Sequence, residues 1–201
     1  MPMNLALDQF ELPIRISQGR PVTDEELMRL SAENEPMRFE REPNGEILVM
    51  TPSGSRTSRI NNEIVFLLTA WARKDGRGVV FDSNGGFRLA DGSVRAADGA
   101  WVPLDRWQAL TDAEQAGFAP ICPDFVIELR SPSDKLPDLQ AKMAQWIANG
   151  VEVAWLIDPI EKAVTIYRPG DQPEHHAHPS SVQGTGPIAG FELVMARVWG
   201  E

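Results

Sequence analysis

The chain has 201 residues, of which 42% are hydrophobic, and its formal net charge is −10. A chain of this size can bury a core without disulfides or structural metal, and its one cysteine, Cys122, cannot form an internal disulfide. The acidic balance argues against attraction of nucleic acid or anionic membrane to the whole surface, although it is compatible with a local basic groove. Solvated surface charge is the better explanation for most of the candidates for such a groove, which are Arg56, Arg59, Arg73, Lys74, Arg77, Arg88 and Arg95.

No segment approaches the roughly 18 to 20 apolar residues of a membrane span, and the N-terminus lacks the pattern of a signal peptide. We therefore expect a cytoplasmic protein with no membrane partner. The sequence contains no internal repeat, long low-complexity run or linker-like break. We expect a single domain over residues 1–201, with its core at about 23–170 and a C-terminal extension at 171–201.

The N-terminal third alternates signals for helices and strands. Thr23 and, three residues later, Glu26 form a capping box that predicts the start of a short helix. Two strands are predicted at 38–41 and 46–50, because a Pro-Asn-Gly turn separates them. Apolar residues recur at helical spacing within 60–71, which predicts an amphipathic helix with one buried stripe.

The remaining chain reads mainly as strands with one further helix. Short β-like runs between Gly and Asp turns predict a meander at 76–102, and 124–130 reads as a core strand. A helix is predicted at 138–149, followed by two apolar strands and, within 191–199, a last strand. The order of these elements predicts an α/β (α+β) fold in which helices flank a mixed central sheet.

Ionisable residues interrupt the predicted core strand. On a strand, Asp124, Glu128 and Arg130 share the face opposite to the apolar face. An ionised carboxylate in such surroundings is costly unless a cation or hydrogen bonds satisfy it. Three explanations fit the strand alone: an ion pair between Glu128 and a nearby arginine, an exposed sheet face, or a metal ligand.

Three further residues favour the metal ligand. Lys142 falls at the edge of the apolar stripe of its helix, and Glu63 has the same relation to the helix at 60–71. Asp98 directly precedes a short apolar strand. Mg²⁺ binds one or two carboxylates together with water and phosphate oxygens, and a neighbouring lysine can orient a nucleophilic water or offset charge on a phosphate. The set therefore predicts a metal site.

The order of these residues resembles the PD-(D/E)XK nuclease superfamily. More specifically, 123–170 resembles the Uma-two-type family of restriction endonucleases, with Pro-Asp, an apolar strand, Glu-x-x-Ser-Pro-Ser, a helix with Lys, and Trp-x-x-Asp-Pro. Upstream, "RFEREPNGEILVMTPSG" and "GFRLADGSVRAADGAWV" are similar to the same family, so that the resemblance covers roughly 23–170. It implies a restriction-endonuclease-like fold, a metal-dependent nuclease that hydrolyses phosphodiester bonds, Mg²⁺ or else Mn²⁺ as cofactor, and nucleic acid, foremost DNA, as substrate.

The resemblance also implies roles for the site residues. Asp98 and Glu128 would hold the metal, Glu63 would assist directly or through water, and Lys142 would position or activate the attacking water. The chain departs from the superfamily pattern because Arg130 stands where a lysine is expected, and arginine holds its proton too tightly for proton transfer. The lysine would then have moved to the following helix. Either of two other acids could replace Glu63: Glu40 and Glu42.

A second hypothesis is a non-catalytic binding or assembly module that has kept the nuclease fold. The acidic surface and the altered Glu-x-Lys pattern favour it. We further expect a homo-oligomer such as a dimer. We expect no metal at His175, His176 and His178, because these residues lie in a Pro-rich and mobile segment without the fixed geometry that a zinc site needs.

Overall fold

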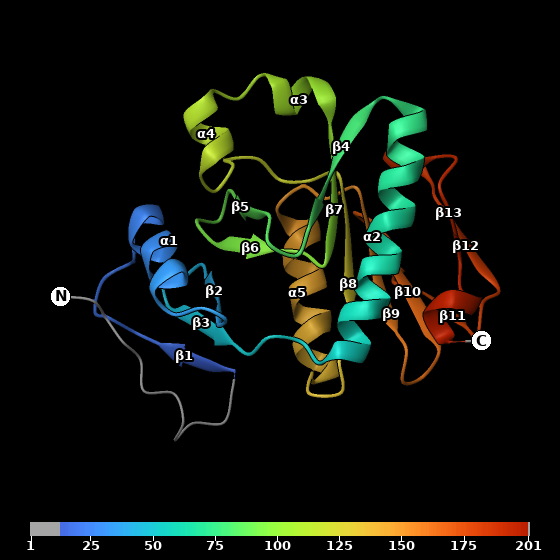
Figure 1. Cartoon of the computed structure of the whole chain (residues 1–201), viewed down its shortest axis with the longest axis horizontal. Coiled ribbons are helices and arrows are strands. Elements are labelled where there is room, and N and C mark those ends of the chain that lie inside the picture. Colours follow the sequence, from blue (N-terminus) through green and yellow to red (C-terminus); the bar gives the residue numbers. More distant parts are fainter. Residues whose placement is uncertain (1–12, 201) are drawn as a thin grey trace.

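The computed structural model describes residues 13–200 and places a six-stranded mixed sheet at its centre (Figure 1). The strands follow one another in the order β11 (Glu174–Ala177), β10 (Ala163–Tyr167), β9 (Val153–Asp158), β8 (Phe125–Leu129), β7 (Gly99–Pro103) and β4 (Gly78–Asp82). β8 and β9 are parallel, whereas the other neighbouring pairs are antiparallel. Every residue of β8 is buried, which confirms the prediction that this strand lies inside the sheet.

Two long helices cover the opposite faces of this sheet. Phe125 and Ile127 of β8 belong to one hydrophobic cluster with the buried stripe of α2 (Ser55–Asp75). Val126 belongs to a second cluster with buried residues of α5 (Leu136–Ala148). This division follows from the alternation of side chains along a strand. Both helices are expected from their apolar periodicity, and the mixed central sheet between them confirms the predicted fold class.

A second sheet is antiparallel and has five strands. Its order is β1 (Ile14–Ile16), β3 (Ile47–Met50), β2 (Arg38–Arg41), β6 (Val94–Ala96) and β5 (Gly86–Arg88). It packs with α1 (Asp24–Glu33), which begins at the predicted capping box. The predicted meander is therefore divided, since β4 and β7 join the central sheet while β5 and β6 join the smaller one. The turn from β6 to β7 connects the two sheets.

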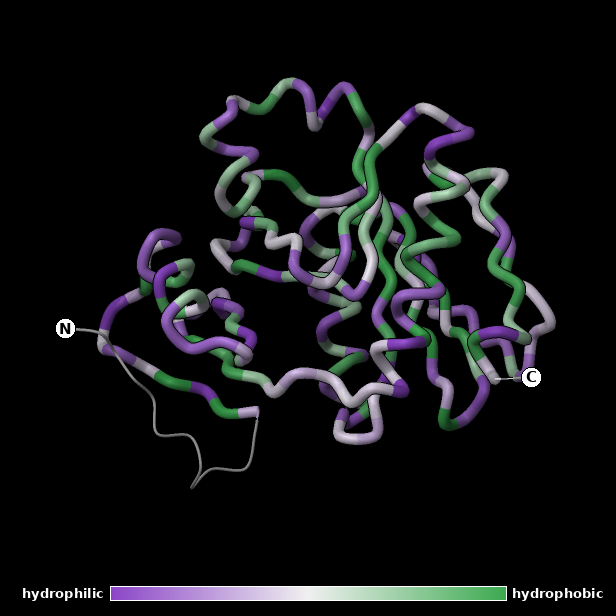
Figure 2. The backbone as a smooth tube through the Cα atoms, in the orientation of Figure 1, coloured by the Kyte–Doolittle hydropathy of each residue, from purple (hydrophilic) through white to green (hydrophobic). Residues whose placement is uncertain are grey.

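The remaining elements lie at the periphery. They are α3 (Leu104–Gln108), α4 (Asp112–Ala116), a hairpin of β12 (Ser181–Gln183) and β13 (Glu192–Val194), a 3-10 turn (Gly186–Ile188) and α6 (Ala196–Trp199). Apolar residues of the β13–α6 segment complete the cluster that covers α2. Figure 2 shows hydrophobic stretches along the central strands and hydrophilic ones in the connecting segments. The predicted last strand is correct only for β13, because α6 follows it directly.

The histidine-rich segment differs from the prediction of a mobile region. It forms β11, an edge strand that pairs with β10 and places His175 opposite Thr165. The segment has no apolar alternation because most of its residues are exposed, so its sequence pattern does not reveal the strand. No helix within residues 13–200 is long and apolar enough to cross a membrane.

Candidate active site

Lys142 of α5 lies at the centre of a cluster of acidic side chains that come from both sheets. Its Nζ is 3.0 Å from Oε1 of Glu128 on β8 and 3.2 Å from Oε1 of Glu40 on β2. It also donates a hydrogen bond of 3.0 Å to the backbone carbonyl of Ala96. The helix on one face of the central sheet therefore contacts a strand of each sheet through a single ammonium group.

Glu128 is held from two sides by residues of the same helix. Its side chain projects towards α5 because it alternates with Ile127 and Leu129, which belong to the cluster on the α2 face. The indole Nε1 of Trp146 donates a hydrogen bond of 2.8 Å to Glu128 Oε1. Trp146 follows Lys142 by four residues, so that both side chains lie on one face of the helix. Glu128 is only 3% exposed.

Asp98 lies in the turn between the two sheets, just before β7. Its Oδ2 accepts a hydrogen bond of 2.8 Å from the backbone N–H of Leu129, the residue after Glu128. The side-chain amide of Asn61 on α2 donates a hydrogen bond of 3.1 Å to the Asp98 backbone carbonyl. These two contacts fix the turn next to the end of β8, which brings the carboxylates of Asp98 and Glu128 into electrostatic interaction.

Glu40 is buried and is held by cations and by a backbone donor. Its Oε2 pairs with Arg95 at 2.8 Å, and its Oε1 accepts a hydrogen bond of 3.1 Å from the Ala96 N–H. Burial opposes ionisation, but the positive charges of Lys142 and Arg95 outweigh it and keep the pKa of Glu40 below its ordinary value. Glu40 is therefore the ionised member of the cluster.

The pKa values of the other two acids move in the opposite direction. Burial raises the pKa of Glu128 to about 7. The positive charge of Lys142 lowers this pKa, whereas the negative charges of Asp98 and Glu40 raise it further. Burial likewise raises the pKa of Asp98, although the hydrogen bond from Leu129 and the positive charge of Lys142 both lower it. Because two carboxylates repel each other in a poorly solvated site, such a pair is stabilised by a further cation or by a proton.

The pKa of Lys142 lies above its ordinary value. Burial lowers it, but the negative charges of Glu128, Glu40 and Asp98 raise it by more. Lys142 is therefore an ammonium group at neutral pH. It can donate hydrogen bonds and neutralise an anion, but it cannot accept a proton from water.

The carboxylates of the site supply some of the oxygen ligands that a hard divalent cation requires. Among residues 13–200, no three His, Cys, Asp or Glu side chains gather closely enough to form a metal cluster. Mg²⁺ nevertheless binds through one or two carboxylates and retains water for its other positions. Asp98 and Glu128 supply two such carboxylates, and both have raised pKa values that a bound cation would lower.

The structure brings together Asp98, Glu128 and Lys142 of the predicted site, but it does not add Glu63. Glu63 pairs instead with Arg197 of α6, at 2.6 Å between Oε1 and an Nη atom. Of the two predicted alternatives, Glu40 enters the cluster, whereas Glu42 pairs with Arg15 at 3.6 Å and with Arg95. Glu63 thus has its contact on α6, which its sequence pattern did not indicate, because a helix pattern identifies the edge of a stripe but not the element that it faces.

Sequence reasoning missed two side chains that support the cluster. One is Trp146, whose position four residues after Lys142 could have indicated the contact with Glu128. Arg95 was considered as part of a basic groove, but it is buried with Glu40. Arg130, in the position expected for the lysine, pairs with Asp158 at 2.7 Å, and so its guanidinium is directed to a carboxylate outside the cluster.

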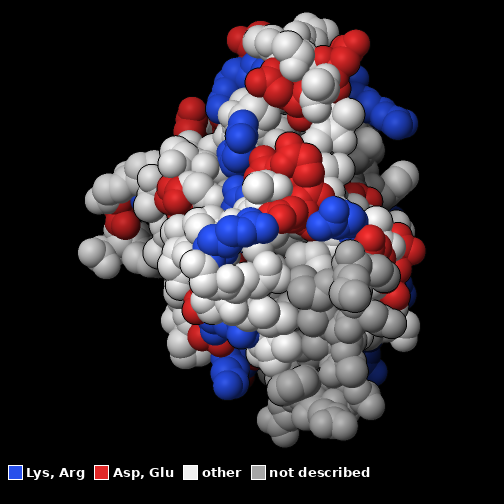
Figure 3. All heavy atoms as spheres, turned by 90° about the vertical axis from the view of Figure 1, so that its left-hand side faces the viewer, with Lys and Arg blue, Asp and Glu red and all other residues white. Residues whose placement is uncertain are grey.

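Two further candidates for a basic groove lie beside acidic side chains. Arg88 lies 3.6 Å from Asp24, and Arg77 lies 2.9 Å from Asp75. Figure 3 shows one face of the molecule on which basic and acidic side chains are interleaved. This mixture agrees with the acidic net charge.

Comparison with solved structures finds a similar fold. A crystal structure described as a putative nuclease belonging to DUF820, from Anabaena variabilis ATCC 29413, has a similar fold, with a TM-score of 0.72. The two chains are 22% identical, and the match covers 90% of this chain and 98% of the other. A cryo-EM structure of a DrdV–DNA complex is similar at a TM-score of 0.39 and 16% identity, over 61% of this chain and 10% of that one.

No curated protein sequence matches the chain. The Uma2 family, described as putative restriction endonuclease, matches residues 24–196. This match spans four of the five strands of the small sheet, from β2 to β6, together with the central sheet and the acidic cluster. The chain therefore belongs to the Uma2 family of putative restriction endonucleases.

Proposed function

We propose that this protein is a Mg²⁺-dependent nuclease that hydrolyses phosphodiester bonds of nucleic acid, with DNA as its substrate and the cytoplasm as its location. The observation that carries the proposal is the Lys142 ammonium, 3.0 Å from a Glu128 carboxylate that also interacts with Asp98. A protonated lysine beside two carboxylates of raised pKa suits the binding of a cation together with an anionic phosphate. Family membership supports the same reaction class.

Asp98 and Glu128 would hold the metal ion. When bound there, Mg²⁺ or Mn²⁺ would supply polarisation of a phosphoryl oxygen and a water molecule of lowered pKa. Glu128, with a pKa of about 7, would lose its proton when the cation binds. Asp98 is held by the Leu129 N–H, which fixes its carboxylate beside the end of β8.

Lys142 would stabilise charge and position water, but it would not act as a base. Its raised pKa keeps it protonated, and an ammonium group next to a phosphate offsets the negative charge that develops in the transition state. Glu40 would serve as a positioning residue, because it holds Lys142 Nζ at 3.2 Å and is itself fixed by Arg95. Glu63 has no part in this scheme, since Arg197 occupies its carboxylate.

The test compares two lysine variants in a cleavage assay on duplex and single-stranded DNA with Mg²⁺. Lys142→Met should reduce the cleavage rate by roughly 10²–10⁴-fold, the usual contribution of one positioned charge-stabilising group. Lys135→Met is the matched control, because Lys135 is exposed just before the same helix and should keep the parent rate. Circular dichroism verifies that both variants fold.

Equal cleavage by Lys142→Met and the parent would refute the assigned role of Lys142. Cleavage that persists in the presence of a chelator would refute metal dependence. Either result leaves the fold and the family membership unaffected.

A second candidate function is a nucleic-acid-binding or assembly module without catalysis. It is favoured by the fact that Lys142 and Trp146 already satisfy Glu128, while Arg130 is paired elsewhere. This module would bind nucleic acid without cleaving it. The absence of cleavage of DNA and RNA by the parent protein, with both Mg²⁺ and Mn²⁺, would support the module against the nuclease.

A further inference from the structure

One edge strand of the central sheet has an apolar middle without charge or proline. β4 is the last strand on its side of the sheet and pairs only with β7 among the described strands. Its middle residues, Val79, Val80 and Phe81, are apolar and only partly buried. Exposed edges are usually blunted by charge or proline. The opposite edge, β11, follows that rule, because it carries Glu174 and two histidines.

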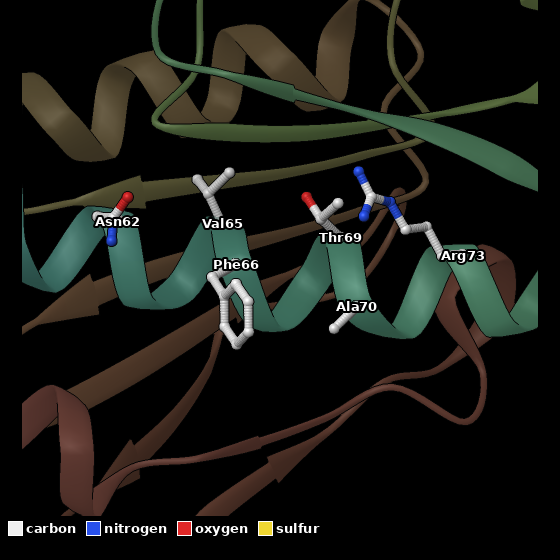
Figure 4. A pocket seen from close by; sticks show the side chains of 6 residues that line it. All are labelled: Asn62, Val65, Phe66, Thr69, Ala70 and Arg73. Atoms are coloured by element: carbon white, nitrogen blue, oxygen red, sulfur yellow. The ribbon is translucent and has the colours of Figure 1, made fainter.

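An apolar stripe on the outer side of α2 adjoins this edge. Asn62, Val65, Phe66, Thr69, Ala70 and Arg73 line an open hollow of about 270 Å³. Figure 4 shows that Val65, Thr69 and Arg73 point towards the strands drawn above the helix, whereas Phe66 projects away from them. Phe66 is 61% exposed, the highest value among the exposed large hydrophobic residues of the described chain. Phe66 is large and exposed, and Ala70, one helical turn away, is small. The stripe therefore carries both a projecting side chain and a space that a side chain of a partner can fill.

The charges at the two ends of β4 are opposite. Arg73 lies in the last turn of α2, shortly before β4 begins, and Asp82 ends the strand. Both residues are exposed. If two copies of β4 pair antiparallel about Val80, Asp82 of each copy lies opposite Gly78 of the other. This pairing brings Asp82 to the end of the partner's strand at which Arg73 lies, so that the charges are complementary at both ends.

We propose that β4 and the outer stripe of α2 form an interface with a second copy of this chain, in an antiparallel and two-fold symmetric arrangement. A second β4 supplies the backbone donors and acceptors that a free strand edge requires. A two-fold axis places the same patch on both sides, so that Phe66 of each copy can enter the hollow beside Ala70 of the other. The proposal does not depend on nuclease activity, because none of these residues belongs to the acidic cluster.

Sedimentation velocity over a concentration series tests this interface. The parent should form a reversible dimer, and Phe66→Glu should raise its dissociation constant by about 30-fold or more, as expected for an anchoring aromatic residue. Ile160→Glu is the matched control, since Ile160 is 50% exposed in the turn after β9 and should leave the dimer unchanged. A parent that remains monomeric at all concentrations would overturn the proposal, as would a dimer that tolerates Phe66→Glu.

Charge reversal tests the antiparallel register. Arg73→Asp and Asp82→Lys should each weaken self-association, because each variant places like charges opposite one another at both ends of the interface. An equimolar mixture of the two variants should restore the dimer. In the mixed dimer the introduced aspartate of one copy faces the introduced lysine of the other, and the unchanged Arg73 and Asp82 meet at the other end. This rescue separates the interface from a folding defect, and variants that associate no better in the mixture than alone would refute the proposed register.

Discussion

Replacement of Glu128 by glutamine is expected to change how the stability of the metal-free protein depends on pH. Glu128 is 3% exposed and has a pKa of about 7, against an ordinary value of 4.5. The folded state therefore binds a proton more tightly than the unfolded state at this position. The contribution of Glu128 to stability is complete below pH 4.5 and is lost as the pH rises through about 7.

The magnitude follows from the shift in pKa. A rise from 4.5 to about 7 corresponds to a loss of about 3 kcal/mol of unfolding free energy above pH 7, because each pKa unit is worth about 1.4 kcal/mol. Glu128→Gln keeps a side-chain oxygen for the Trp146 hydrogen bond but carries no charge. The variant should therefore be as stable as the parent near pH 4.5 and about 3 kcal/mol more stable near pH 8.

Urea unfolding followed by tryptophan fluorescence, at several pH values in the presence of a chelator, measures this difference. The difference between the two curves contains the titration of Glu128 together with the change that loss of its charge makes in the pKa of Asp98, with which Glu128 interacts. A difference that is independent of pH between 4.5 and 8 would refute the reasoning. A variant that is less stable than the parent at pH 8 would show that the Lys142–Glu128 pair outweighs the cost of burying the carboxylate.

Two further substitutions test the support of the cluster and the exclusion of Glu63. Arg95→Met should lower the unfolding free energy by about 3–5 kcal/mol at neutral pH, because it removes one of the two cations that the described residues place beside the buried Glu40. Urea unfolding measures the loss, and a change below about 1 kcal/mol would contradict it. Glu63→Ala should change stability by no more than about 1 kcal/mol, because its partner Arg197 is largely exposed. It should also leave the Mg²⁺-dependent cleavage rate unchanged, and a loss of about 10²-fold would restore Glu63 as a catalytic residue.

The sequence was informative where a local pattern determines the environment of a residue. Glu128 lies on a strand whose apolar alternation required burial, and Lys142 lies at the edge of an apolar helix stripe, so their proximity could be predicted. Glu40 could not be assigned in the same way. Its strand belongs to the small sheet, and the position of that sheet depends on the turn from β6 to β7, a long-range feature without a local signal.

The same distinction explains the fold predictions. The capping box at Thr23 arises from contacts within one element, and the helix periodicity of α2 and α5 is a local pattern that burial of one helix face imposes; the structure reproduces both. β11 was missed because it is an edge strand with mostly exposed residues, and it is stabilised by backbone pairing with β10. Backbone pairing leaves no trace in the alternation of side chains.

Calorimetric titration of the parent protein and of Asp98→Asn with Mg²⁺ at pH 7 tests the central proposal most directly. The parent should bind one Mg²⁺ and release a fraction of a proton, because Glu128 with a pKa of about 7 is partly protonated before the cation binds. Titrations in buffers of different ionisation enthalpy detect this proton. Asp98→Asn should lose the binding. A parent that binds no Mg²⁺, or an Asp98→Asn variant that binds it with the same affinity and proton release, would contradict a metal site at Asp98 and Glu128.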